Sequence, residues 1–455
     1  MKRLRFWGSL WAAKGTRAAL RLLGRSATYL PGAVALRLCP SFLSQIGKPA
    51  RVVAVTGTNG KTTVANLLGG ALAKHGLSVL DNRLGSNTAA GIACALLAGA
   101  SLSGRVKRDV AVLEMDERSA ARVLPFVRPE LLAVTNLFRD SIMRNAHPEY
   151  IAGIISANVP DSTKLLLNAD DLISCGVAPD LPRAYFGLKR MDTDVTECVN
   201  LINDVQICPH CRSGLVFDYR RYHHIGRAKC PDCGFASPEY DYAGRLNPEN
   251  GTLSVTDPAG EFDLRLTGDS VFNIYNLLTV AAAMRELGLS PDETSAALDG
   301  AAVLESRYHE IEAGNVRVVM QMAKDRNALA CSRAFDYAAG KPGRKELILM
   351  MNNLRDSKAW SENTCWLYDC DFELLNREEI TRIVATGPRA LDYCLRLRFA
   401  GIPEEKLRFA EREIDAPNEL ELEPGESVYI FYGTDAIALA NQVRDAVKGR
   451  ALHDA

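Results

Sequence analysis

The segment that most constrains the fold is VVAVTGTNGKTT, residues 52–63, in which an apolar run meets a glycine-rich turn. The β-branched run at 51–56 predicts a buried parallel strand, and apolar residues at helical spacing over 62–76 predict a helix. A glycine loop between a strand and a helix N-terminus binds phosphate, because free backbone N–H groups and the helix dipole attract anions. The common wording of such loops needs a glycine where this chain has Val55. We expect Gly57 and Gly60 to provide the close backbone approach instead.

This turn predicts a binding site for ATP and Mg²⁺. The Lys61 amine is expected to reach the terminal phosphates, and the Thr62 hydroxyl is expected to hold magnesium. The segment DVAVLEMDE ends in acids, where a strand of an open α/β sheet presents its ligand-binding edge. Glu114 is therefore the candidate for a second magnesium contact, with a solvated strand end as the alternative. The predicted nucleotide-binding residues of the loop are Gly57, Thr58, Asn59, Gly60, Lys61, Thr62 and Thr63.

Strand and helix patterns alternate along most of the chain. PELLAVTNLFRD and TKLLLNADD describe further strands that end in polar residues. This alternation predicts an α/β protein with a doubly wound, mostly parallel sheet. A second alternation begins near residue 315 and predicts a smaller α/β domain without a phosphate loop of its own. We therefore predict a basic helical segment at 1–50, a central ATP-binding domain at 51–312 and a C-terminal domain at 313–455.

Four of the twelve cysteines form two matched pairs. The sequence C-x2-C-x18-C-x2-C involves Cys208, Cys211, Cys230 and Cys233. That spacing is typical of a structural zinc site, because four thiolates close a tetrahedral shell. We predict a four-cysteine zinc ribbon inserted at 198–245, with four incidental thiols as the alternative. His223 and His224 are expected to be surface or packing residues, because the metal shell is already full.

The first 37 residues contain eight basic residues and no acidic one. Basic residues interrupt every apolar run, which excludes a secretory signal, and no window reaches the ~18 apolar residues of a transmembrane helix. One interpretation is a basic amphipathic helix packed on its own domain; the other is a helix resting on an anionic membrane surface. The net charge of the chain is -1, which argues against a nucleic-acid partner. We expect a cytoplasmic protein whose thiols stay reduced.

Several motifs resemble those of the Mur ligase superfamily. TGTNGKTT is the loop wording of that superfamily, and NRLGSNTAAGI, EMDE, NLFRD and LNADD follow in the order of its MurT-type members. The resemblance continues almost to the C-terminus and includes the ribbon, where YHHIG is similar to the family's YHIG. Only about 50 residues precede the loop here, too few for the uridine-nucleotide domain that begins the ligases that build the stem peptide. MurT-type chains also lack that domain.

The resemblance implies a central domain of the Mur ligase fold and a specific reaction. The α-carboxylate of D-glutamate in lipid II would be amidated to D-isoglutamine through an acyl phosphate, at the expense of ATP. It also implies a heterodimer with a class I glutaminase of the GatD type, which supplies ammonia from glutamine. Because lipid II is lipid-anchored, the protein would work beside the inner face of the cell membrane.

Three more residues take roles from the resemblance. Asn273 and Asn276, in SVFNIYNLL, match an element that contacts adenine, with helix capping as the alternative. Asp356, in NNLRD, matches an aspartate that completes the Cys–His pair of the glutaminase, with a loop N-cap or a surface acid as the alternative. With Lys61 and Glu114, Asp356 makes up the predicted catalytic set.

Two other functions fit parts of the sequence. A ligase that adds amino acids, of the folylpolyglutamate or stem-peptide type, would share the phosphate loop but leave the ribbon unexplained. A zinc-ribbon scaffold with a vestigial ATP site is the third reading. The intact Gly60, Lys61, Thr62 and Glu114 argue against it.

Overall fold

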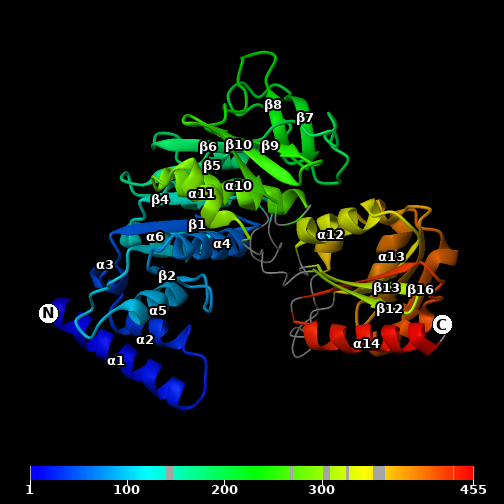
Figure 1. Cartoon of the computed structure of the whole chain (residues 1–455), viewed down its shortest axis with the longest axis horizontal. Coiled ribbons are helices and arrows are strands. Elements are labelled where there is room, and N and C mark those ends of the chain that lie inside the picture. The colour runs from blue at the N-terminus through cyan, green and yellow to red at the C-terminus, as the bar shows by residue number, and fades with distance from the viewer. Residues whose placement is uncertain are drawn as a thin grey trace. The chain divides into compact units, whose positions relative to one another are not determined.

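The computed structural model of the chain describes residues 2–139, 147–266, 268, 270–300, 308–323, 327–351, 364–433 and 435–453. These residues form two compact units, which Figure 1 draws in one colour gradient along the chain. The first unit comprises the described residues of Met1–Phe138, His147–Val199 and Asn203–Val303. The second comprises those of Leu304–Ala455, together with Asn200–Ile202 and Arg139.

The first unit is built on a nine-stranded sheet in the order β11-β10-β9-β6-β5-β4-β1-β3-β2. Neighbouring strands are parallel from β2 through β9, and β9, β10 and β11 form an antiparallel meander. The strands are β1 Arg51–Thr56, β2 Val79–Asp81, β3 Val110–Glu114, β4 Leu131–Val134, β5 Lys164–Asn168, β6 Arg183–Leu188, β9 Tyr242–Asn247, β10 Thr252–Asp257 and β11 Gly260–Arg265. The prediction of a doubly wound, mostly parallel sheet is confirmed.

Strand β1 lies between β3 and β4, so later strands of the chain are added to the sheet on both sides of it. In such sheets the crevice at the carboxyl end of the strand where the direction changes is the usual ligand site. The apolar run Val52–Val55 is buried, as expected for a strand covered on both faces. The helices are α1 Lys2–Leu22, α2 Leu30–Leu38, α3 Phe42–Gln45, α4 Lys61–Lys74, α5 Ala89–Gly99, α6 Ala120–Val127, α8 Pro148–Ser156, α9 Leu172–Cys175, α10 Val271–Glu286 and α11 Pro291–Leu298.

The segment before β1 is helical. Helix α1 packs against α2, and α2 packs against α5. The side chains of Phe6, Leu10 and Ala13 are buried in the same core as β1 and β3. This packing matches the interpretation of α1 as a helix docked on its own domain. Within the described part of the chain, no helix combines the length and the apolar character that crossing a bilayer requires.

An insertion separates β6 from its parallel neighbour β9. It contains the antiparallel hairpin of β7, Val216–Tyr222, and β8, Ile225–Lys229. Two short bridges, Ile207 to Gly214 and Lys229 to Ala236, flank this hairpin. The strand β9, which begins at Tyr242, already belongs to the main sheet.

The second unit contains a six-stranded sheet in the order β12-β13-β17-β14-β15-β16, parallel except for the β12–β13 pair. Its first strand, β12, starts before the boundary expected from the sequence. The strands are β12 Tyr308–Ala313, β13 Val316–Met322, β14 Lys345–Met350, β15 Ile380–Thr386, β16 Leu407–Ala410 and β17 Ser427–Tyr432. The helices are α12 Ala328–Gly340, α13 Ala390–Phe399 and α14 Ile437–His453. The prediction of a second, smaller α/β domain is confirmed.

Candidate functional site

The glycine-rich loop between β1 and α4 depends on both of its glycines. Gly57 and Gly60 have φ angles of 129° and 85°, in the range that side chains rarely adopt. A Cβ atom on Gly57 would collide with the Thr135 hydroxyl, and one on Gly60 would collide with the side-chain oxygen of Asn276. The loop is therefore closely packed between the end of β4 and the start of α10.

The segment that follows β4 holds this loop in place. The backbone N–H of Thr58 donates to the Asn136 carbonyl at 2.7 Å, and the N–H of Asn59 donates to the Asn136 side-chain oxygen at 3.1 Å. The Phe138 N–H donates to the Thr58 hydroxyl at 2.9 Å. These bonds occupy Thr58 and Asn59, whereas the first N–H groups of α4 have no partner within the helix. Within the described part of the chain no side chain caps the start of α4, so its first N–H groups are available to an anion.

Lys61 lies folded over the loop. Its amine donates to the carbonyls of Gly57 and Thr58 and forms an ion pair with Glu117 at 2.9 Å. Both side chains of the pair are largely buried. Burial raises the pKa of Glu117, and the Lys61 charge opposes this shift. Sequence reasoning missed Glu117, although it lies in the same EMDE motif as Glu114.

The Thr62 hydroxyl meets Glu114 across the loop. It donates to a carboxylate oxygen of Glu114 at 3.0 Å, and the Asn87 amide donates to the same oxygen at 3.0 Å. The backbone of Glu114 is fixed by Asn82, whose side chain accepts from its N–H and donates to its carbonyl. A hydroxyl beside a carboxylate is the oxygen donor set that Mg²⁺ prefers, so these residues fit a magnesium ion. Asn82 and Asn87 were not singled out from the sequence.

The two asparagines of α10 do not cap the helix. Ser270 does so, since its hydroxyl accepts a hydrogen bond from the Asn273 N–H at 3.3 Å. Asn276 is buried against Gly60, and the Asn273 amide lies beside Gly268. Asn276 of α10 therefore lies at the phosphate loop, next to the residue before Lys61.

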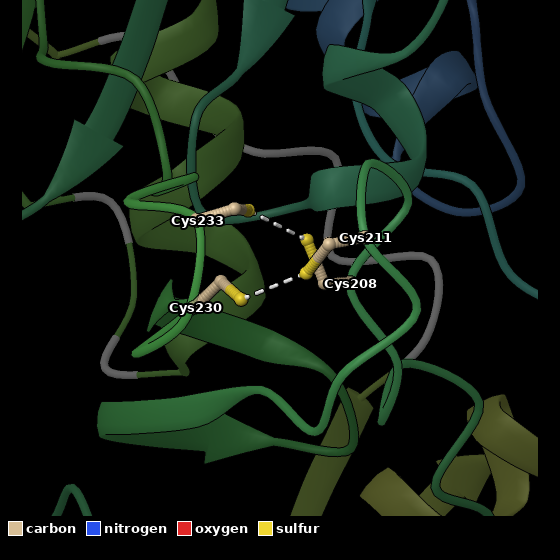
Figure 2. Close-up of side chains that lie close together, drawn as sticks. All are labelled: Cys208, Cys211, Cys230 and Cys233. Carbon is tan, nitrogen blue, oxygen red and sulfur yellow. Dashed lines mark hydrogen bonds between the residues drawn. The ribbon is translucent and has the colours of Figure 1, made fainter.

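The four paired cysteines converge at the base of the β7–β8 hairpin. Figure 2 shows their sulfur atoms facing one another, and all four lie within 4.8 Å of each other. Four sulfurs at the ~2.3 Å of a zinc–thiolate bond are separated by ~3.8 Å in a tetrahedron. All four are free thiols, and hydrogen bonds from Ser213 lower the pKa of Cys211 to about 6. This cluster fits a tetrahedral zinc ion.

The two CxxC turns share one backbone design. In the first, the Arg212 N–H donates to the Cys208 carbonyl at 2.9 Å; in the second, the Gly234 N–H donates to the Cys230 carbonyl at 3.2 Å. The residues Arg212 and Gly234 have φ angles of 67° and 74°. Both pairs therefore present their thiols from a tight turn, which supports a structural rather than a catalytic metal centre.

The tip of the ribbon hairpin reaches the nucleotide side of the sheet. His224 is fully buried and lies over the ring of Phe138, with centroids 4.3 Å apart. Its Nε2 atom is 3.2 Å from a carboxylate oxygen of Asp171. Asp171 also accepts from the Leu137 N–H at 2.7 Å and from Ile173 and Ser174 of α9. The ribbon thus contacts the segment that holds the phosphate loop.

Asp170, which follows β5, forms hydrogen bonds with the ribbon. It is fully buried and accepts from the hydroxyls of Tyr240 and Tyr275, each at 2.6 Å. Burial raises the pKa of Asp170, and the nearby Arg221 guanidinium opposes this shift. Arg221 also pairs with Asp194 at 2.8 Å. The acids that follow β5 were read from the sequence as polar residues at a strand exit, but they form buried structural contacts.

The residue predicted to serve the glutaminase partner, Asp356, belongs to the C-terminal part of the chain. Asp356 lies outside the described residues. Asp371 is buried and accepts hydrogen bonds from the Asn200 amide at 2.8 Å and the Leu201 N–H at 2.6 Å. These bonds explain why Asn200–Ile202 belongs to the second unit.

Comparisons with known proteins match most of the chain. A family model described as the MurT ligase C-terminal domain matches residues 325–436. The chain is 30% identical over 403 residues to a protein of Staphylococcus aureus (strain COL), the lipid II isoglutaminyl synthase (glutamine-hydrolyzing) subunit MurT, covering 88% of this chain and 89% of that one.

Solved structures share the fold. A pseudomurein peptide ligase type C from Methanothermus fervidus superposes with a TM-score of 0.66 at 20% identity, over 90% of this chain and 80% of that one. The MurF ligase of Thermotoga maritima, solved in complex with ADP, gives a TM-score of 0.59 at 16% identity, over 93% and 85%. The prediction of a Mur-ligase-like fold is therefore confirmed.

Proposed function

The chain belongs to the MurT family of Mur-type ligases, and from that membership we propose that it amidates lipid II. The D-glutamate α-carboxylate of the stem peptide becomes D-isoglutamine, with ATP as the energy source and glutamine as the origin of the nitrogen. The observation that supports this most is the contact of Thr62 with Glu114 at the start of α4, directly after Lys61. It occurs in a chain related over 88% of its length to a glutamine-hydrolysing ligase subunit.

The proposed reaction has two steps. A carboxylate oxygen attacks the γ-phosphorus of ATP, ADP leaves, and an acyl phosphate forms. Ammonia then attacks the acyl carbon, loses a proton and expels inorganic phosphate. The first N–H groups of α4 and the Lys61 amine would hold the phosphates and neutralise charge that develops during transfer.

Glu117 would position the Lys61 amine in this reaction. The carboxylate is buried, and its ion pair holds the amine above the loop carbonyls of Gly57 and Thr58. A long lysine side chain has many rotamers, so an anchored amine loses less freedom when phosphates arrive. Removal of Glu117 should therefore weaken ATP binding without removing the phosphate contacts themselves.

Magnesium and zinc are part of the proposal. Thr62 and Glu114 would hold Mg²⁺, which would offset the negative charge of the phosphates when bound. Cys208, Cys211, Cys230 and Cys233 would hold one structural Zn²⁺, because four thiolates leave no open coordination position. Asn273 and Asn276 would contact the nucleotide from α10.

The nitrogen would come from a separate glutaminase. The relative's name describes a subunit of a glutamine-hydrolysing enzyme, which supports a partner of the class I, GatD type bound to the C-terminal unit. Asp356 would complete the catalytic Cys–His pair of that partner. The substrate is lipid-linked, so we also place the complex at the cytoplasmic face of the cell membrane.

Reconstitution of the two-subunit reaction tests this function. The purified chain, combined with a class I glutaminase, should convert lipid II to its amidated form in the presence of ATP and glutamine, as detected by mass spectrometry. Lys61→Ala should lower turnover about 100-fold or more, because a preorganised positive charge at the transferring phosphoryl group is lost. Lys74→Ala, at the exposed end of the same helix, is the matched control and should keep full activity.

Two results would contradict the proposal. Retained amidation in Lys61→Ala would show that the loop does not bind the reacting phosphates. Formation of a peptide bond to an added amino acid, with no amidated lipid II, would instead favour the amino-acid-adding type of ligase. For the partner contact, Asp356→Asn should lower glutamine hydrolysis while ATP binding stays unchanged.

A further inference from the structure

Helix α1 has a second apolar face that faces away from the protein. Phe6, Leu10 and Ala13 point into the core, whereas Leu4, Trp11 and Leu22 are 75%, 58% and 88% exposed. These three exposed residues lie on one side of the helix, because spacings of seven and eighteen residues are close to whole numbers of turns. Exposed, uncharged residues fill the stripe between them, namely Gly8, Ala12, Gly15, Ala18 and Ala19.

The exposed stripe continues onto a neighbouring loop. The Trp11 indole N–H donates to the Leu102 carbonyl at 3.4 Å, and the Leu102 side chain is 73% exposed. Leu23, directly after the helix, is also exposed. The same loop carries the exposed basic residues Arg105 and Lys107. The apolar surface is therefore wider than a single helix.

Arginines border the stripe. Arg3, Arg5, Arg21 and Arg25 are exposed and form no ion pair with any residue that the structure describes. Lys14 differs from them, because its amine donates to the Ala100 carbonyl at 2.6 Å near the end of α5. The chain has no acidic residue before Asp81, so no nearby carboxylate in sequence offsets this charge.

We propose that this surface, the α1 face, binds an anionic phospholipid bilayer. It consists of Leu4, Trp11, Leu22, Leu23 and Leu102, with the border of Arg3, Arg5, Arg21 and Arg25. A helix that lies in the interface buries an apolar stripe at the headgroup level while flanking basic residues contact anionic headgroups. Tryptophan is enriched at that depth, because its ring is apolar and its N–H is polar.

Charge and polarity select the bilayer over other partners. Pairing of two α1 faces would bring two sets of arginines together, which like-charge repulsion disfavours. Nucleic acid would satisfy the arginines but leave the leucines and Trp11 in water. The inference rests on the proposed function, because a lipid-linked substrate requires the nucleotide site to stay close to the membrane.

Vesicle co-sedimentation of the full chain tests this surface. The wild type should bind vesicles of phosphatidylcholine with about one third phosphatidylglycerol, and bind pure phosphatidylcholine vesicles much less. Replacement of both Arg3 and Arg5 by Gln should reduce partitioning about 25-fold, at about fivefold for each basic residue near an anionic surface. The matched control, Arg122→Gln with Arg190→Gln, removes two exposed arginines elsewhere in the same unit and should bind like the wild type.

Fluorescence gives an independent measurement. Lipids brominated on their acyl chains should quench emission of the wild type, and this quenching should largely disappear in Trp11→Phe. Equal binding to both vesicle types, wild-type binding by the Arg3 and Arg5 variant, or unchanged quenching in Trp11→Phe would overturn the proposal. Amidation of a water-soluble lipid II analogue distinguishes a failure of the membrane-binding proposal from a failure of the proposed function. The variants should still amidate the analogue, because they alter only the α1 face. If the proposed function is wrong, the wild type will not amidate it either.

Discussion

Asp171 joins three parts of the first unit, so its substitution should disturb both stability and ATP binding. Its carboxylate accepts hydrogen bonds from the Leu137 N–H, from Ile173 and Ser174 in α9, and faces His224 of the ribbon. Asp171 is itself fully buried. Water cannot replace the lost acceptor there without a rearrangement.

The expected cost follows from these contacts. A buried donor left without an acceptor costs about 1–3 kcal/mol, and a lost helix cap costs about 1 kcal/mol. Asp171→Ala should therefore lower the free energy of unfolding by about 3–6 kcal/mol, a large part of the ~5–15 kcal/mol typical of a domain. Asp171→Asn keeps one acceptor oxygen and should cost about 2 kcal/mol, or a fall of about 4–8 °C in Tm.

Thermal unfolding and ATP affinity should be measured on the full chain for Asp171→Asn. The affinity should fall as well, because Leu137 lies between Asn136 and Phe138, which hold Thr58 and Asn59 of the phosphate loop. The control is Asp218→Asn, which removes an exposed carboxylate of the same ribbon that pairs with Lys229 at 2.7 Å. That change should leave Tm nearly unaltered, because exposed ion pairs contribute little. A lower Tm with normal ATP affinity would refute the coupling between Asp171 and the phosphate loop. An unchanged Tm would show that the hydrogen bonds of Asp171 do not stabilise the fold.

Three further outcomes are expected. Metal analysis should find about one zinc per chain, and Cys208→Ser should lose that zinc and lower Tm, because folding of a ribbon depends on its metal; a folded, metal-free wild-type chain would contradict this. Glu114→Gln should raise the Mg²⁺ concentration needed for ATP turnover, and an unchanged requirement would remove Glu114 from the magnesium site. Burial raises the pKa of Glu346 from 4.5 to about 7. The folded chain therefore keeps a proton that the unfolded chain loses in this range, and the free energy of unfolding should fall by about 3 kcal/mol as pH rises through it. Denaturation of Glu346→Gln should lack this slope, and a slope equal to that of the wild type would assign it to another group.

Local patterns predicted most of the fold. The strand, glycine loop and helix at 51–74 appear as β1, the loop and α4, because short-range periodicity and glycine positions fix such a unit. The spacing of Cys208, Cys211, Cys230 and Cys233 predicted a cluster that the structure brings within 4.8 Å. The alternation and turn residues of GRLNPENGTLSVTDPAGEFDLRLTG likewise predict hairpins. They correspond to the antiparallel strands β9, β10 and β11.

Contacts between distant segments were not predictable. Asn82 and Asn87 reach Glu114 only because β2 and β3 are neighbours in the sheet, which no local pattern reveals. Glu117 looks like a solvated acid in the sequence, but the structure buries it beside Lys61. His224 was expected to pack, yet its place beside Asp171 and Phe138 required the hairpin tip to be located in space.

The place of the ribbon between β6 and β9 also affects how the chain folds during synthesis. Parallel neighbours are normally joined by a helix that packs on the sheet, whereas here residues 189–241 must close before β9 can pair. Zinc joins the two cysteine turns and so shortens the loop that must be closed, which lowers its entropic cost. Metal supply would then control the addition of the last three strands and α10 to the sheet. A nascent chain made without zinc would expose the open edge of β6, a site for aggregation or for degradation.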